Sequence, residues 1–235
     1  MKTLTIKLNA PLQSYGNEAS FNQRTSKSYP TKSAVLGMIA ASLGYRRDNS
    51  KILVLNDLSF AVRVDQPGSM LTDFQIVRYG KKAGDQKLTY RKYLQDSVFM
   101  VAIGSEDNEL IEKIKYSLHH PKFQLFLGRR SNPIAGLLEI REFTGINPVE
   151  ALKQIPWQAA TWYQKRYHGE NYKVELIADA SLLPDQEVEM VKQKIRSFDQ
   201  RNRYHEYNSI AHERFDLKNE QFNLEDTDHD IYSII

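Results

Sequence analysis

The amino-acid sequence predicts an α+β fold whose elements follow one another as strand, helix, strand, strand, helix and strand. Three observations lead to this prediction. Residues 3–9 (TLTIKLN) alternate apolar and polar side chains with the period of two that is typical of a strand. Residues 33–43 form an almost wholly apolar helix that Gly44 is expected to end. Residues 97–103 (SVFMVAI) are a continuous apolar run, as in a strand covered on both faces.

Three further elements complete the order. Residues 60–64 alternate apolar side chains with smaller or charged ones and predict the second strand. Ser105 is expected to cap a helix over 106–118, which has acidic residues in its first turn and an apolar stripe. A last strand is predicted within 134–142 (IAGLLEIRE). This order is the ferredoxin-like arrangement that RNA-recognition (RRM-type) modules share.

One connection is much longer than this fold requires. Residues 66–96 place 31 residues between the second and third strands, where a short turn would be sufficient. We therefore predict a core domain over 1–145 that carries 66–96 as an insertion. Residues 146–235 are predicted to form a smaller, β-containing C-terminal region, with a strand at 172–178, a short helix at 186–197 and an acidic tail.

Charge is divided unevenly along the chain. Residues 1–150 contain 21 Lys and Arg against 14 Asp and Glu, a net charge of +7, whereas residues 151–235 contain 11 against 15, a net charge of −4. A basic half indicates a polyanionic partner. The absence of cysteine excludes disulfides and thiolate metal sites. Because neither a signal-peptide pattern nor a long apolar run is present, we expect a cytoplasmic protein with no membrane contact.

The insertion carries the clearest nucleic-acid signal. Its stretch 78–93 (RYGKKAGDQKLTYRKY) sets six cations and three tyrosines against one acid, Asp85. Cations neutralise phosphates, and aromatic rings stack on unpaired bases at about 1–3 kcal/mol each. A solvated surface ribbon is the alternative interpretation. The candidate RNA contacts in this basic hairpin are Arg78, Tyr79, Lys81, Lys82, Lys87, Tyr90, Arg91 and Lys92.

The stretch 127–133 (LGRRSNP) is a second candidate. Gly128 permits a close backbone approach to a ligand, and Arg129 and Arg130 offer forked donors that match phosphate geometry. A solvated loop between helix and strand explains the same residues, so this stretch alone does not decide between the two.

The start of the apolar helix is a third candidate. Thr31 or Ser33 can cap it, and the free amides there, together with Lys32, form a general anion site. The residues before Lys32 lack the glycines of a nucleotide-binding phosphate loop, and Pro30 removes an amide donor. A nucleoside triphosphate site is therefore excluded.

Six short motifs occur in this order along the chain: LNAPLQSYG, RTSKSYPTKSAVLGMIAASLG, RRD, FAVRVDQPG, LTDFQ and FLGRRSNP. Together they resemble the CasD family of CRISPR-associated proteins, the subunits that bind the 5′ handle of the guide RNA (crRNA) in the type I-E Cascade complex. The similarity is dense over residues 1–103 and 121–133. It is looser over 162–215, around SFDQRNRY.

The resemblance implies a modified RNA-recognition fold of the RAMP superfamily, with 66–96 as a thumb hairpin and Gly128 in a glycine-rich loop. It implies a non-catalytic structural subunit, without a cofactor, that grips the crRNA 5′ handle and caps the Cascade backbone in antiviral defence. The backbone and large subunits would be its neighbours, with target DNA near the PAM end reached through the complex. It also assigns RNA contacts to Gln13, Ser14, Tyr15 and Arg24.

The family usually has Trp where this chain has Tyr15, so stacking by this residue is expected to be less extensive.

Catalysis is the alternative from a different class. Related type I-C subunits cut precursor crRNA without a metal, which requires a general base and acid such as His, Lys or Tyr. His119 and His120, with Lys122, form the only such cluster in the basic half, at a predicted helix end where histidine commonly contacts the helix C-terminus. No metal is expected, since the remaining candidate ligands are neighbours in a polar tail: Asp226, Asp228, His229 and Asp230.

Overall fold

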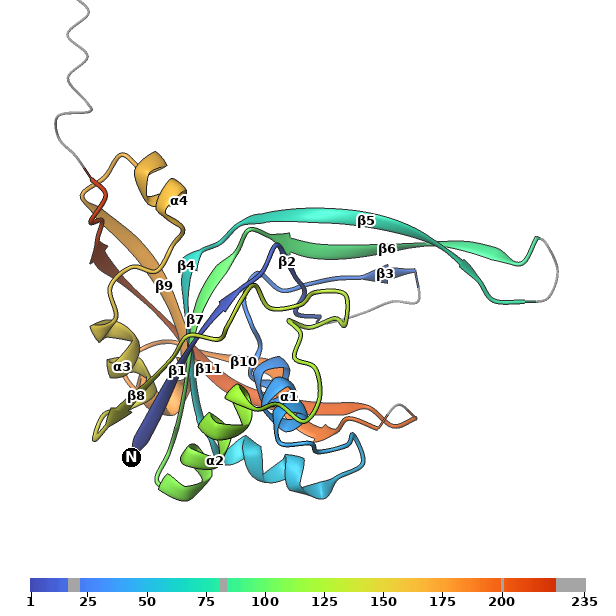
Figure 1. Cartoon of the computed structure of the whole chain (residues 1–235), viewed down its shortest axis with the longest axis horizontal. Coiled ribbons are helices and arrows are strands. Elements are labelled where there is room, and N and C mark those ends of the chain that lie inside the picture. The colour runs from blue at the N-terminus through green and yellow to red at the C-terminus, as the bar shows by residue number, and fades with distance from the viewer. Residues whose placement is uncertain (17–21, 81–83, 200, 223–235) are drawn as a thin grey trace, which may run out of the picture.

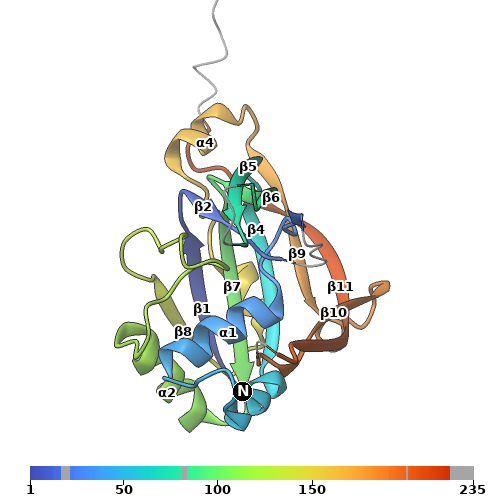
Figure 2. The same ribbon diagram turned by 90° about the vertical axis from the view of Figure 1, so that its right-hand side faces the viewer.

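A seven-stranded antiparallel sheet runs through the centre of the computed structural model, which describes residues 1–16, 22–80, 84–199 and 201–222 (Figure 1). Its strand order is β10-β11-β9-β4-β7-β1-β8. Helices α1 and α2 cover one face and α3 covers the other, as Figures 1 and 2 show. The chain is therefore a mixed α+β protein, as predicted. The strands of this sheet are β1 Lys2–Asn9, β4 Ser59–Gln66, β7 Val98–Ser105, β8 Ile140–Thr144, β9 Asn171–Asp179, β10 Val188–Ser197 and β11 Tyr204–Lys218.

Four of the predicted strands are confirmed, at 3–9, 60–64, 97–103 and 172–178. The strand expected within 134–142 begins only at Ile140, where β8 pairs with β1.

The region predicted as a helix at 186–197 is a strand, β10, so that prediction was wrong. Its apolar spacing also fits a period of two, with Val191, Gln193 and Ile195 buried on one side. Pairing with β11 decides between the two patterns, because tertiary context overrides local propensity.

The helices are α1 Lys32–Ser42, α2 Asn108–His119, α3 Pro148–Gln154 and α4 Thr161–Arg166, with 3₁₀ turns η1 Ser50–Asp57 and η2 Ala180–Leu182. Thr31 caps α1, as predicted, by accepting a hydrogen bond from the backbone of Ala34. Asp107, not Ser105, caps α2 by accepting one from Leu110. In the part of the chain that the structure describes, no helix is long and apolar enough to cross a membrane.

Helix α1 is apolar all round because it is covered on both sides. Leu36 and Ile39 are fully buried in the core that β1, β4 and β7 form with α2. Gly37 faces the second half of the chain, where an added Cβ would lie 3.5 Å from the Phe198 ring. The interpretation of α1 as a helix packed between two partners is confirmed.

The second half continues the sheet of the first half. Strand β9 pairs with β4 over Ala61–Val64, and β11 pairs with β9 in turn. Lys32 on α1 contacts Asp179 at the end of β9, with 2.8 Å between Nζ and Oδ2. Asp179 also accepts hydrogen bonds from the Phe60 backbone and the Asn208 side chain. This buried carboxylate therefore joins α1, β4 and β11.

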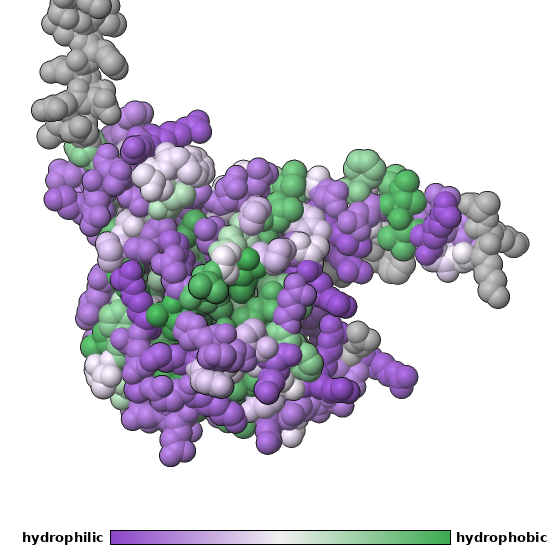
Figure 3. Space-filling view, in the orientation of Figure 1, coloured by the Kyte–Doolittle hydropathy of each residue, from purple (hydrophilic) through white to green (hydrophobic). Residues whose placement is uncertain are grey.

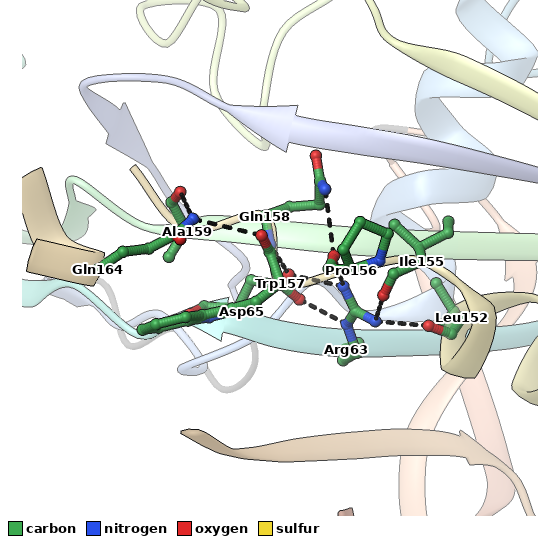
Figure 4. A network of polar contacts seen from close by, with 9 residues as sticks. All are labelled: Arg63, Asp65, Leu152, Ile155, Pro156, Trp157, Gln158, Ala159 and Gln164. Atoms are coloured by element: carbon green, nitrogen blue, oxygen red, sulfur yellow. Dashed lines mark hydrogen bonds and ion pairs between the residues drawn. The ribbon is translucent and has the colours of Figure 1, made fainter. Parts of the chain in front are cut away.

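A fully buried ion pair lies on the α3 face of β4 (Figure 4). Arg63 donates from Nε and Nη2 to the two carboxylate oxygens of Asp65, at 2.7 Å each. Its other three N–H groups bond the carbonyls of Leu152, Ile155 and Pro156. All five guanidinium donors are satisfied. The ion pair therefore connects the end of α3 and the residues that follow it to the sheet.

A second sheet projects from the first (Figure 1). The 66–96 insertion forms a long antiparallel hairpin of β5 Ser69–Arg78 and β6 Gln86–Gln95. Two short strands, β2 Leu12–Gln13 and β3 Gln23–Arg24, pair with β6 near the base of the hairpin. The base is thus held by several strands, whereas the outer part is two-stranded.

Glu142 on β8 supports a pH prediction. It accepts hydrogen bonds from Lys115 on α2, at 2.6 Å, and from Lys2 on β1, at 2.9 Å. These bonds lower the pKa of Glu142 from 4.5 to about 2. A carboxyl group whose pKa is lowered on folding stabilises the folded state at pH values above its ordinary pKa. This stabilisation is lost as the pH falls from about 4.5 towards 2.

We therefore expect Glu142→Gln to lower the free energy of unfolding at neutral pH by less than about 1 kcal/mol, because the groups lie near the surface. Urea unfolding of the parent protein and of the Glu142→Gln variant, at pH 7 and at pH 3, measures this difference in the free energy of unfolding. The difference should shrink by more than half at pH 3, and an undiminished difference there contradicts this assignment.

Candidate nucleic-acid interface

The β5–β6 hairpin exposes an apolar stripe. Ten cross-strand pairs run from Ser69↔Gln95 to Arg78↔Gln86, so residues two apart share a face. Phe74 and Ile76 are 65% and 61% exposed. Figure 3 shows hydrophobic side chains along the outer part of the hairpin. Exposed apolar surface of this extent is typical of an interaction site. The stripe consists of Met70, Phe74, Ile76, Leu88 and Tyr90.

A hollow of about 270 Å³ lies beside this stripe, midway along the hairpin. Tyr90, which is 43% exposed, offers a ring on its wall, and Lys92 and Arg24 add positive charge. The parallel pairing of β3 with β6 brings Arg24 opposite Arg91. The hollow therefore combines a stacking surface with cations, which is the chemistry that single-stranded nucleic acid requires. Its lining residues are Gln23, Arg24, Thr72, Tyr90 and Lys92.

Arg129 comes to the opposite face of β6 from a distant part of the sequence. Its guanidinium lies 4.5 Å from the centre of the Tyr93 ring, a cation–π arrangement. Its Nη2 donates to the carbonyl of Arg24, at 3.2 Å. These two contacts fix the direction of the side chain, so Arg129 is held against the face of β6 that carries Tyr93 and Arg91, opposite the hollow.

Two guanidinium nitrogens in this cluster lack a hydrogen-bond partner among the described residues. They are Nε of Arg91 and Nη1 of Arg129, and both atoms are buried. A buried donor without a partner is unfavourable. Both side chains remain partly exposed, so their guanidinium charge can attract an anion. Burial raises the pKa of Tyr93, but Arg129, Ser131 and Arg91 favour the phenolate and leave the pKa below its ordinary value. The direction of this pKa shift reflects the positive charge of Arg129 and Arg91 beside the ring.

The loop 127–132 holds Arg129 in position. The backbone of Ser14 donates to the Leu127 carbonyl, and that of Leu127 donates to the Asn132 carbonyl. Gly128 has φ of +85°, and an added Cβ there would overlap the Ser14 carbonyl oxygen. In this structure the glycine permits a close approach to Ser14, and an approach to a ligand at Gly128 stays a prediction. Arg130 is exposed on the same loop.

The N-terminal candidates are packing residues. Tyr15 is 2% exposed and packs edge-on against Phe99, while its hydroxyl donates to Gln13 at 2.6 Å. Gln13 donates to the Ser97 carbonyl, and the Ser14 hydroxyl donates to that of Lys92. A ring buried to this extent has no face for a base, which corrects the expectation of stacking by Tyr15. These residues instead hold β6 and the residues after it in place through hydrogen bonds and packing.

The start of α1 is also covered. Lys32 is buried and paired with Asp179, and its backbone N–H donates to the side chain of Gln193, at 3.2 Å. The hydroxyls of Thr31 and Ser33 lie 3.3 Å apart. The free-amide anion site predicted here is therefore corrected, because residues of β9 and β10 already occupy it.

The remaining hairpin candidates lie far from the hollow along the hairpin. Arg78, Tyr79 and Lys87 are exposed at its outer end. Lys81 and Lys82 lie outside the described residues.

The candidate catalytic histidines lie elsewhere. His120 stacks on Tyr116, with ring centres 4.4 Å apart, and its Nδ1 lies 3.1 Å from the Tyr116 carbonyl. It therefore contacts the C-terminal end of α2, on the opposite side of the molecule from the hairpin (Figures 1 and 2). Over the described ranges, no group of His, Asp and Glu is arranged to hold a metal ion. The tail residues Asp226, Asp228, His229 and Asp230 fall outside those ranges.

Sequence and structural similarity place the chain among the CRISPR-associated proteins. A family model described as CRISPR-associated protein (Cas_Cas5) matches residues 3–210, and the chain belongs to this family. It is similar to the CRISPR system Cascade subunit CasD of Escherichia coli (strain K12), with 28% identity over 167 residues, or 63% of this chain and 75% of that one. The predicted resemblance to CasD is confirmed.

Two solved structures share the fold. A CRISPR RNA-guided surveillance complex contains a chain with a TM-score of 0.75 and 26% identity, covering 92% of this chain and 91% of that one. A Cas protein crystal structure gives a TM-score of 0.66 and 27% identity, covering 94% and 97%.

Proposed function

We propose that this protein is a non-catalytic, RNA-binding structural subunit of a type I-E Cascade complex. It grips the 5′ handle of the crRNA and caps one end of the backbone. The observation that carries the proposal is the middle of the hairpin, where Tyr90 and Lys92 line a hollow with Arg24 on one face of β6, while Arg91 lies with Tyr93 and Arg129 on the other face. Similarity to CasD and to a chain of an RNA-guided surveillance complex supports it.

In this proposal the hairpin acts as a thumb on a ferredoxin-like core. The order β8-β1-β7-β4, with every neighbour antiparallel, supports such a core over 1–145. Phosphates bind the partly exposed guanidinium groups of Arg91 and Arg129 on one face of β6, and an unstacked base lies against Tyr90 on the other face. The apolar stripe on the thumb contacts the neighbouring backbone subunit. The large subunit and, through the complex, target DNA near the PAM end are the other partners.

The first test replaces the two arginines that have unsatisfied donors. We expect Arg91→Ala/Arg129→Ala to weaken binding of a labelled RNA with the repeat-derived handle about tenfold. Each lost phosphate contact should also reduce the slope of log affinity against log salt by about 0.7. Fluorescence anisotropy of the full chain in EDTA, at several salt concentrations, measures both quantities, and electrophoresis of the same samples reveals any cleavage.

Lys113→Ala/Lys165→Ala is the matched control, because it removes the same charge from α2 and α4. A scrambled handle tests selectivity. Equal affinity of the arginine variant and the parent protein would refute the proposed interface. Discrete RNA fragments that depend on His119 and His120 would instead assign the protein as a nuclease.

A further inference from the structure

The tip of the β10–β11 hairpin is basic although it belongs to the acidic half of the chain. Residues 192–207 (KQKIRSFDQRNRYHEY) contain five Lys and Arg against two acids, whereas residues 151–235 as a whole carry a net charge of −4. Like the β5–β6 hairpin, this stretch interleaves cations with tyrosines. Figure 1 shows that both hairpins project from the same side of the molecule.

The tip is anchored to the core, so its cations are held in place. The Phe198 ring packs over Gly37 of α1, and His205 lies edge-on to it with ring centres 5.8 Å apart. The backbone of Arg201 donates to the Asp199 carboxylate, at 2.8 Å, which shapes the turn. The guanidinium of Arg203 lies 5.8 Å from the centre of the Phe198 ring.

Positive charges gather here without equal compensation. Arg47, from the loop after α1, and Arg201 line a hollow of about 310 Å³ with Asp48 and Asp199. Burial and the charge of Arg47 lower the pKa of Arg203, so these guanidinium groups are within electrostatic reach of each other. Arg196 pairs with Glu206 at 2.7 Å. Across the described ranges, Arg47, Arg201 and Arg203 make no ion pair.

Two features favour nucleic acid as the ligand of this surface. Guanidinium groups present a fork that fits phosphate oxygens, and several like charges held together suit a polyanion better than a single carboxylate. Tyr204 and Tyr207 are 50% and 59% exposed beside the cations. Lys192 lies over the Tyr207 ring, 5.8 Å from its centre. This mixture of arginine and exposed aromatic side chains is the pattern expected at a nucleic-acid contact.

We propose that the β10–β11 tip, with Arg47, Arg201 and Arg203, is a second binding surface for the phosphodiester backbone of nucleic acid. It is separate from the hollow beside Tyr90 and does not depend on the function proposed for that hollow. The phosphodiester backbone bound here belongs either to a further stretch of the guide RNA or to DNA, since the same chemistry recognises both.

The test compares Arg47→Ala/Arg201→Ala/Arg203→Ala with the parent full chain. Three labelled probes are used, namely handle RNA, the same RNA extended at its 3′ end, and duplex DNA. We expect binding of at least one probe to weaken about tenfold, with a salt slope reduced by about 0.7 for each contact to a single strand or 0.9 for each contact to a duplex. All three residues are exposed by surface area, although the Arg203 guanidinium is partly shielded over the Phe198 ring, so thermal unfolding should change only slightly.

Two controls separate specific contact from general charge. Lys113→Ala/Lys165→Ala/Arg166→Ala removes the same charge elsewhere and should change binding less than twofold. The Arg→Lys triple variant keeps the charge but not the fork, so its affinity should lie between those of the alanine variant and the parent protein. A loss confined to RNA or to DNA identifies the source of the backbone.

Unchanged binding of all three probes, or an equal loss in the first control, overturns the inference. Neither result affects the hollow, because the Arg91→Ala/Arg129→Ala variant tests that site independently.

Discussion

Asp65→Ala should lower the free energy of unfolding by about 3–5 kcal/mol, which is among the largest effects of any single substitution in this chain. The change leaves the Arg63 guanidinium buried without its counter-ion, since both side chains are fully buried. It also removes the acceptor for the Gln158 backbone N–H, now bonded at 2.6 Å. Urea unfolding followed by tryptophan fluorescence measures the loss, because Trp157 donates to the Asp65 carbonyl at 2.8 Å.

The double variant Arg63→Met/Asp65→Leu is the control. Replacing both charges by apolar side chains of similar volume removes the uncompensated charge, so it should be much less destabilising than Asp65→Ala alone. The carbonyls of Leu152, Ile155 and Pro156 lose a donor in that variant, and some loss is expected from this cause. A double variant as unstable as the single one would show that the ion pair is not the source of the effect.

Gly128→Ala should disrupt the RNA interface more than it disrupts the fold. Alanine at φ of +85° is strained, and its Cβ would overlap the Ser14 carbonyl oxygen, so the loop must move away from Ser14. Displacement of the loop carries Arg129 off the Tyr93 ring. We expect a destabilisation of about 1–3 kcal/mol together with a loss of handle affinity about as large as that of Arg129→Ala.

Gly136→Ala is the matched control for this prediction. Gly136 also has a positive φ, of +76°, but an added Cβ there meets nothing within 4 Å. It should therefore show the backbone strain without the loss of RNA binding. Handle affinity and thermal unfolding, measured on both variants, separate the two effects. Normal RNA binding by Gly128→Ala would mean that the loop does not position Arg129.

The core of the fold was predictable because its signals are local. The alternation in 3–9, the apolar run at 97–103 and the Thr31 cap each depend on neighbouring residues, and each is confirmed. The strand at 188–197 was missed because its partner, β11, is supplied by a later part of the chain. The burial of Arg63 was equally hidden, since alternation does not reveal that α3 covers the second face of β4. The domain boundary at 145 stays a prediction.

The candidate site was predictable in composition but not in geometry. The basic stretch of the hairpin and Arg129 could be found from charge and aromatic content alone. Their meeting at Tyr93 could not, because it depends on the loop 127–132 folding back against Ser14. For the same reason Tyr15 and Lys32 were assigned to RNA, although long-range contacts with Phe99 and Asp179 bury them. Averaging the charge of the second half also concealed the basic tip at 192–207.

The length of the β5–β6 hairpin determines how far the protein can act from its own core. Ten residues in each strand, at about 3.4 Å per residue, give an arm of roughly 30 Å, comparable to the diameter of a small domain. A two-stranded ribbon of this kind is only marginally stable alone in water, so its outer half gains little rigidity from within. A neighbour that covers the apolar stripe would stiffen the arm while it binds. If the proposed neighbour binds there, assembly would set the shape of the arm, and the order of the outer hairpin would report whether the subunit is in its place in the complex.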